Sequence, residues 1–137
     1  MPFVKIYHHE NLSYDELKLI SNSIHSSLIN NFNVPTKDLF HLCLPLNHHQ
    51  FVFDKDYNLS VNEIRTCKLI YIDILCGNGR SSHQKEALFL NIVNNITSCT
   101  QMRPADIFIT IKESSKENWS FGEGKQQMMN KENVYES

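Results

Sequence analysis

Residues 35–40 read PTKDLF and residues 104–108 read PADIF, so one short pattern occurs twice in the chain. Each copy has a proline, a short polar turn, an aspartate, an aliphatic residue and a phenylalanine. Each follows a segment whose apolar residues recur at helical spacing, and each leads into a strand-like segment. The recurrence predicts two halves built on the same β-α-β design.

The first half begins with a strand-like run that leads to a helix. Ser13 and Glu16 have the spacing of a capping box, which marks a helix start. Apolar side chains then recur at helical spacing as far as Phe32, and Pro35 ends the helix because the residue before a proline avoids the α conformation. The predicted strands are residues 2–7 and 39–46, and residues 50–53 are a candidate hairpin arm for the second of them.

The second half repeats this order. Residues 68–75 form a strand rich in β-branched side chains, and Ser81 with Gln84 makes a second capping box. An amphipathic helix follows, and the last strand is predicted at residues 107–111. The predicted halves cover about residues 2–62 and 63–124, and a polar tail covers 125–137.

The predicted fold is α+β, with the two halves in one domain. Right-handed crossovers make the two strands of each half parallel. A two-fold relation between the halves then gives a four-stranded sheet with both helices on one face. The other face needs cover, and a homo-oligomer would supply it.

Composition excludes several classes of function. The chain has 137 residues, 41% of them hydrophobic, and a net charge of −2. That charge gives no electrostatic reason to expect nucleic acid or an anionic membrane as partner, and no apolar run is long enough to span a bilayer. The four cysteines form no CxxC pair, so we expect no metal, no dithiol chemistry and mostly buried, reduced thiols in a cytoplasmic protein.

Pro2 stands directly behind the initiator Met1 and opens the first strand. Small residues at this position generally permit removal of the methionine, which would leave a secondary amine at the chain start. An α-amino group titrates near ~8 in model peptides, and desolvation or a nearby cation lowers that value towards neutrality. Such an amine can act as a general base or acid. The structural alternative is that Pro2 only begins an edge strand, where its missing N–H has no consequence.

Topology brings two candidate partners to the end of the sheet where Pro2 lies. Asp38 precedes the strand expected to run parallel to the first one. Arg80 follows the strand expected to run antiparallel, and it lies just before a helix, where an anion is favoured. An amine, a carboxylate and a guanidinium suit proton transfer on an oxo acid. Alternatively, Asp38 caps local backbone groups, as its counterpart Asp106 would, and Arg80 is a solvated residue.

Other candidates have plain structural alternatives. The pairs His8-His9 and His48-His49 suggest metal ligands, but adjacent strand residues point to opposite faces, so we predict no metal site. His41 fits a hydrogen-bonded strand histidine. Residues 119–124, WSFGEG, form either a cover over the sheet or the apolar wall of a pocket.

Taken together, these residues resemble the tautomerase superfamily, most closely its malonate semialdehyde decarboxylase branch. The likeness spans residues 2 to about 125. The positions that carry it are Pro2, Val34-Pro35 with Asp38, Gly79-Arg80-Ser81 with Gln84-Lys85, and the most specific string, Asn118-Trp119-Ser120-Phe121-Gly122.

The resemblance implies a homotrimer whose sheets form a barrel, with no cofactor. It also implies that Pro2 is the acid or base, that Asp38 assists proton transfer and that Arg80 binds the substrate carboxylate. Trp119 and Phe121 match residues that wall the pocket, and we expect Phe40 to join them.

One position departs from the decarboxylases of this branch, which have another arginine where this chain has Asn78. An amide can hydrogen-bond a carboxylate but carries no charge. We therefore predict a tautomerase acting on the keto and enol forms of a small 2-oxo acid, with Asn78 in substrate binding. A decarboxylase or hydratase with a cationic Pro2, and a non-catalytic relative, remain the alternatives.

Overall fold

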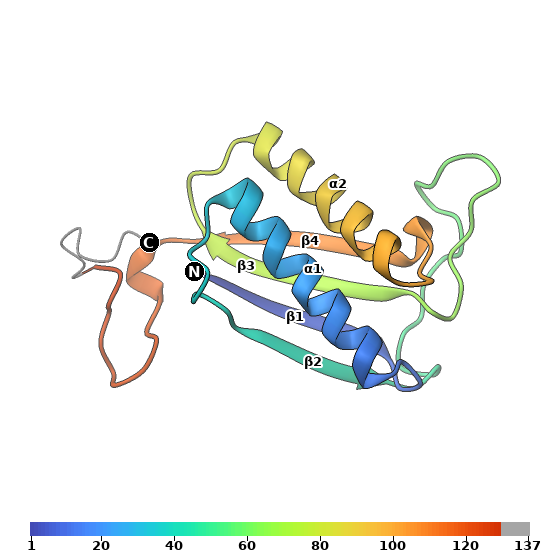
Figure 1. Cartoon of the computed structure of the whole chain (residues 1–137), viewed down its shortest axis with the longest axis horizontal. Helices are drawn as coiled ribbons and strands as arrows, with labels where there is room; N and C mark the ends of the chain where they lie inside the picture. The colour runs from blue at the N-terminus through green and yellow to red at the C-terminus, as the bar shows by residue number, and fades with distance from the viewer. Residues whose placement is uncertain (130–137) are drawn as a thin grey trace.

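The computed structural model of the chain describes residues 1–129. Strands and helices follow one another in the predicted order, and a short 3-10 helix stands at each end of the last strand (Figure 1). In chain order the elements are β1 (Pro2–His9), α1 (Tyr14–Phe32), β2 (His41–Leu46), β3 (Ile70–Gly77), α2 (Ser82–Cys99), η1 (Pro104–Asp106), β4 (Ile107–Ser114) and η2 (Lys116–Asn118).

The strands form one mixed sheet in the order β2-β1-β3-β4. β1 is parallel to β2 and antiparallel to β3, and β3 is parallel to β4. Val4 pairs with His41 in the first half and Ile70 pairs with Ile107 in the second, so the two halves share one register. The predicted α+β fold of two β-α-β halves is confirmed, including the antiparallel contact between them.

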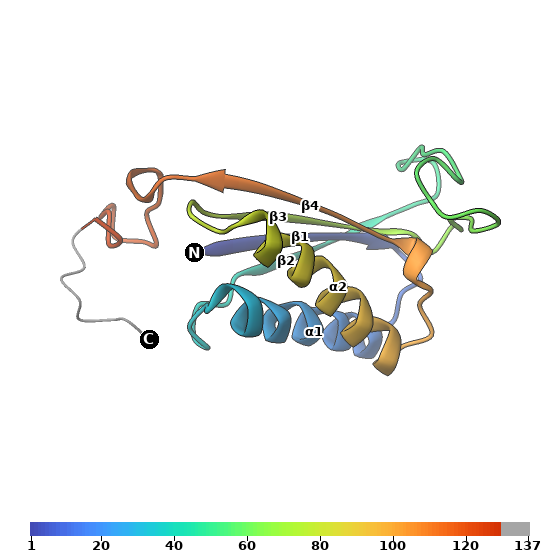
Figure 2. The same cartoon turned by 90° about the horizontal axis from the view of Figure 1, so that it is seen from above.

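Both helices cover the same face of the sheet, as Figure 2 shows from above. Buried and half-buried residues alternate along β1 and β3, because successive side chains of a strand point to opposite faces. The buried set packs against one stripe of each helix. This core contains Val4, Ile6, Ile70, Ile72 and Ile74 from the sheet and Ile20, Ile24, Leu28, Leu88, Ile92 and Ile96 from the helices.

The helices begin where the capping signals predicted and meet along a polar seam. Ser81 and Gln84 form a complete capping box, whereas Ser13 accepts only the backbone N–H of Glu16. Between the helices, the Asn31 amide donates to Asn91 Oδ1 at 2.8 Å, and Asn95 donates to Ser27 Oγ at 2.9 Å. These bonds fix the relative register of α1 and α2, because buried polar groups need specific partners.

The sheet face away from the helices is open within residues 1–129, as Figure 2 shows. It carries apolar side chains together with the charged Lys5, Asp73 and Lys112. Leu42 on one edge strand is 45% exposed and Phe108 on the other is 47% exposed. Between them, the rings of Tyr7 and Tyr71 stack with centroids 5.5 Å apart. The predicted uncovered face is therefore present.

The expectation of a hairpin arm at residues 50–53 is wrong. Residues 47–69 form a long connection without strand or helix between β2 and β3. A turn directs the chain out of the sheet directly after β2, since Asn47 accepts from the backbone N–H groups of His49 and Gln50. Phe51 and Phe53 then pack against each other, with ring centroids 5.2 Å apart, instead of joining a strand ladder.

Strand boundaries also differ from the predicted ones by two or three residues. β1 continues to His9, β2 begins only at His41, β3 is displaced to Ile70–Gly77 and β4 continues to Ser114. Residues 130–137 of the predicted polar tail lie outside the described range.

The prediction of mostly buried thiols is wrong as well. All four cysteines are free, but only Cys76 is buried, while Cys67 and Cys99 are exposed. Cys67 lies in the connection before β3, and Cys99 ends α2, so neither lies on a core face. Neither α-helix in residues 1–129 combines the length and apolar character that a bilayer span requires.

Candidate functional site

The start of β1 lies against the end of β3, because Pro2 pairs with Cys76. Met1 extends past this pair, and its ammonium group forms an ion pair with the Asp38 carboxylate. Its side chain fills the space that a side chain at Gly77 would need, beside Arg80. Glycine at position 77 therefore lets the chain start, the Asp38 turn and the β3–α2 connection meet.

Asp38 is held by a turn but does not cap it. The Asp38 backbone N–H donates to the Pro35 carbonyl at 3.0 Å. One carboxylate oxygen of Asp38 meets the amino group of Met1, and the other is buried with no hydrogen-bond partner in residues 1–129. A buried acceptor without a partner is unfavourable in a folded protein, so it marks a place where a further donor would be stabilised.

Asp106, the counterpart in the second half, has a different role. It is only 2% exposed, and its carboxylate accepts from the Thr66 backbone N–H and hydroxyl, both at 2.7 Å. Asp106 thus stabilises the entry to β3, as the structural alternative for Asp38 would require. The same short sequence pattern carries a structural carboxylate in one half and an incompletely bonded one in the other.

Arg80 lies in the connection between β3 and α2 and is fixed by backbone acceptors. Its guanidinium donates to the Gly77 carbonyl at 3.2 Å and to the Phe32 carbonyl at 3.0 Å. It also lies over the Phe32 ring, 4.9 Å from the centroid. None of the ion pairs found in residues 1–129 includes Arg80, so its charge is oriented without being neutralised by a carboxylate.

The remaining predicted site residues lie at the same end of the sheet but not in that cluster. Asn78 is exposed in the connection after β3. Phe40, Phe121 and Trp119 form an aromatic row, with centroid distances of 5.7 Å and 6.0 Å between neighbours. The segment with Trp119 extends beyond the sheet end instead of covering the sheet (Figure 1). The buried indole N–H of Trp119 has no partner in residues 1–129.

Sequence reasoning missed three residues that support this end of the sheet. Phe32 orients Arg80 and Gly77 leaves room for the chain start, as described above. His25 forms a hydrogen bond between Nε2 and the Thr36 carbonyl at 2.8 Å, inside the turn that carries Asp38. From the sequence, Gly77 is interpreted only as a possible turn glycine, and nothing in the helical pattern of α1 singles out His25.

His41, the first residue of β2, packs beside His25 with ring centroids 6.0 Å apart. Its Nδ1 is 2.8 Å from Ser21 Oγ, while its buried Nε2 has no partner in residues 1–129. The expectation of a hydrogen-bonded strand histidine thus holds for one of its two ring nitrogens. Burial, and to a lesser degree the charge of His25, lowers the pKa of His41 from 6.5 to about 4.

This shift predicts acid sensitivity. The unfolded chain binds a proton at His41 below pH 6.5, and the folded chain resists it down to about pH 4, so stability falls across that window. We expect the loss to be about 2 kcal/mol in free energy of unfolding, reduced from the full shift because the ring is partly solvated. The free energy of unfolding, measured by denaturant at several pH values in this window, should depend less steeply on pH in His41→Gln. The exposed control His49→Gln should show the same pH dependence as the unmodified protein.

These features define a class of α+β proteins with two β-α-β halves. An amino group, a carboxylate and a guanidinium lie at the end of the sheet where β1 begins. The family described as "Tautomerase enzyme" matches residues 23–122. The chain is also 37% identical to probable tautomerase YusQ of Bacillus subtilis (strain 168), over 94% of this chain and 99% of that protein. The chain therefore belongs to the tautomerase family, which indicates an enzyme of the isomerase type.

Solved structures share the fold. The malonate semialdehyde decarboxylase FG41, inhibited by 3-bromopropiolate, superposes with a TM-score of 0.85 over 93% of this chain and 94% of its own, at 22% identity. Native fused 4-OT superposes with a TM-score of 0.75 over 94% and 99% of the two chains, at 12% identity. At these identities the likeness concerns the fold alone.

Proposed function

We propose that the protein, after loss of Met1, is a tautomerase that interconverts the keto and enol forms of a small 2-oxo acid, with Pro2 as the base. The observation that carries this proposal is the Asp38 carboxylate. One of its oxygens meets the amino group at the chain start, and the other is buried without a partner in residues 1–129. A carboxylate serving only the turn would be bonded as Asp106 is.

Loss of Met1 would free the space beside Gly77 and Arg80 that its side chain fills. A substrate there would have the Pro2 nitrogen on one side and the Arg80 guanidinium on the other. Arg80 would hold the substrate carboxylate, since guanidinium and carboxylate match in shape and charge. Asp38 would orient the Pro2 amine or a water molecule.

In the enol-to-keto direction, the neutral Pro2 nitrogen takes the proton of the enol hydroxyl and delivers it to the neighbouring carbon, so Pro2 is neutral again when the ketone has formed. In the keto-to-enol direction, the same nitrogen takes a proton from that carbon and returns it to the carbonyl oxygen. Atoms and charges balance without any oxidant or reductant. The required base is a neutral amine near pH 7, which fits general base catalysis.

The open sheet face supports a homotrimer as the working form. Leu42 and Phe108 are about half exposed on this face, and a set of large exposed side chains on one face marks an association surface. We propose that three copies pack these faces together. Analytical ultracentrifugation is expected to give the mass of a trimer, and a monomer at assay concentrations would contradict this part of the proposal.

The assay that tests the proposal uses purified protein whose first residue is Pro2, as verified by mass spectrometry. We expect the enol form of an aromatic 2-oxo acid such as phenylpyruvate to be lost faster than in buffer, with a rate proportional to protein concentration. No acceleration with a Met-free, folded protein would refute the proposal. A decarboxylase or hydratase would instead release carbon dioxide or add water to the substrate.

Asn78→Arg is expected to strengthen substrate binding. The exposed Asn78 lies two residues before Arg80, so an arginine there adds a second cation for the substrate carboxylate. A charge-assisted contact contributes about 1.5–3 kcal/mol, so KM should fall roughly 10-fold or more. Asn62→Arg, in the connection before β3, is the matched control. An unchanged KM in Asn78→Arg would show that the carboxylate does not bind at this position.

A further inference from the structure

A large cavity lies at the end of the sheet opposite Pro2. It measures about 830 Å³ and is bounded by the end of β1, the end of β2, the connection after β2 and the residues that enter β3. This volume lies within the range of about 300–1,000 Å³ that small-molecule sites occupy. None of the residues assigned above to the proposed tautomerase site lines it.

The two-fold relation of the halves makes this cavity the counterpart of the Pro2 site. The helix caps Ser13 and Ser81 lie 68 residues apart, as do Asp38 and Asp106. By the same relation, the pairing of Val4 with His41 corresponds to that of Ile72 with Ile109, so Pro2 corresponds to Ile70. Lys68 lies two residues before that position, at the entry to β3, and brings an amine close to the place of the Pro2 counterpart.

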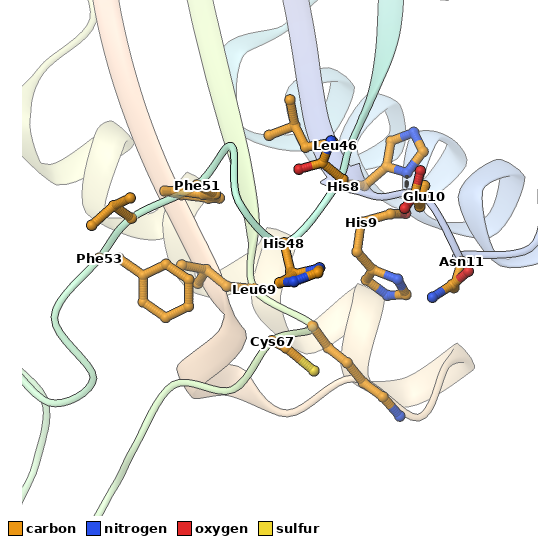
Figure 3. A pocket seen from close by; sticks show the side chains of 13 residues that line it. His8, His9, Glu10, Asn11, Leu46, His48, Phe51, Phe53, Cys67 and Leu69 are labelled. Atoms are coloured by element: carbon orange, nitrogen blue, oxygen red, sulfur yellow. Dashed lines mark hydrogen bonds between the residues drawn. The ribbon is translucent and has the colours of Figure 1, made fainter.

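The lining of the cavity is divided between apolar and basic side chains. Phe51, Phe53 and Leu46 form the apolar part. Figure 3 shows the two phenylalanines on one side, His9 from β1 on the other, and His48 between them in this view. The basic part consists of His9, His48, Lys68 and the buried His8, and Glu10 is the one acidic side chain among the lining residues.

One feature of this basic group favours an acidic ligand. Burial lowers the pKa of His9, and the charges of His8 and Lys68 lower it further, while the charge of Glu16 acts in the opposite direction. The basic side chains around the cavity therefore lie close enough to repel one another. A carboxylate would relieve that repulsion.

The geometry points to a binding site for a small apolar carboxylate, such as an aryl-alkyl or medium-chain acid. We propose that its ring or chain packs on Phe51 and Phe53. Its carboxylate would face Lys68, His9 and His48. The site binds without catalysing proton transfer, because the carboxylate that corresponds to Asp38 is Asp106, and Asp106 is fully engaged by Thr66. No group of three or more potential metal ligands occurs in residues 1–129.

Titration by two-dimensional NMR tests the proposal, with 4-phenylbutyrate as the probe and 4-phenylbutanol as its uncharged match. We expect saturable shifts in His9, His48 and Phe53 with the acid and weaker binding of the alcohol. Lys68→Gln should weaken binding of the acid roughly 3- to 10-fold, as loss of one partly solvated charge contact predicts. Lys55→Gln, a change in the same connection outside the cavity lining, should leave the affinity unchanged.

Three results would overturn the proposal. The first is no saturable shift at the cavity, or shifts confined to Gly77–Arg80, which would place the probe at the other end of the sheet. The second is equal affinity for the acid and the alcohol. The third is a set of cavity signals that responds to dilution of the protein and not to the acid, which would show that a second copy fills the space. Since Lys68 lies outside the proposed tautomerase site, Lys68→Gln should retain tautomerase activity whichever result is found.

Discussion

Replacing Pro2 with alanine is expected to lower kcat/KM for enol–keto conversion by roughly 10²- to 10⁴-fold, the usual contribution of a positioned general base. Alanine also permits removal of Met1, so the variant keeps a free amine at the chain start. That amine is primary, and it lacks the ring that fixes the backbone of Pro2 beside Cys76. The rate loss would therefore report on the proline nitrogen itself.

A control proline in the equivalent half shows whether the loss is specific. Pro104 begins η1, far from the chain start in sequence and ahead of β4. Pro104→Ala is expected to keep its activity, apart from any small change in thermal stability. Equal activity of Pro2→Ala and the unmodified protein, both verified as Met-free by mass spectrometry, would rule out Pro2 as the base.

The second large effect is expected for Arg80→Ala, with a loss of roughly 10- to 100-fold in kcat/KM for a 2-oxo acid, as removal of one charge-assisted contact predicts. The kcat/KM of Arg80→Lys should lie between those of Arg80→Ala and the unmodified protein, because lysine keeps the charge but lacks the planar pair of donors. The effect should be much smaller for the methyl ester of the same substrate, which has no carboxylate to bind.

Arg80 also donates to the carbonyls of Gly77 and Phe32, so its removal is expected to loosen this end of the sheet. The ester comparison separates the two effects, since structural damage would slow acid and ester alike. Arg65→Ala, which removes an arginine that bonds only to the connection after β2 among the described contacts, is the matched control. Equal losses with acid and ester would contradict a role for Arg80 in carboxylate binding.

Much of the fold could be predicted because it depends on local patterns that occur twice. The capping signals at Ser13 and Ser81, together with the repeated proline turns, fixed the order of elements and the pairing of the halves. The connection at residues 47–69 could not be predicted, because it is held by side-chain bonds to the backbone, such as that of Arg65 to the Tyr57 carbonyl. Such bonds have no periodic trace in the sequence.

The candidate site was predictable in part for the same reason. Strand directions alone placed Pro2, Asp38 and Arg80 at one end of the sheet. What the sequence could not distinguish was the different use of Asp38 and Asp106, which share one motif. That difference arises from Thr66, whose hydroxyl and N–H donate to Asp106, while within residues 1–129 no such pair of donors reaches Asp38.

The aromatic residues show the limit of the resemblance. Trp119, Phe121 and Phe40 lie at the predicted end of the sheet and contact one another in a row. The sequence pattern does not determine the path that the chain takes after the last strand, so the position of this row could not be predicted. In the proposed homotrimer, the packing of the copies would determine which surface these three aromatic side chains contact.

The central claim is that Pro2 carries a neutral amine that moves the proton. Nitrogen-15 NMR of Met-free protein labelled at proline tests it most directly, because only an amino-terminal proline nitrogen titrates. We predict a Pro2 pKa below the ordinary α-amino value of ~8, because partial burial and the Arg80 cation are expected to outweigh the Asp38 carboxylate, which acts in the opposite direction; the value should match the pH at which activity reaches half its maximum. A pKa clearly above ~8, which would leave Pro2 protonated at neutral pH, or activity that does not follow the titration of Pro2, would contradict the claim.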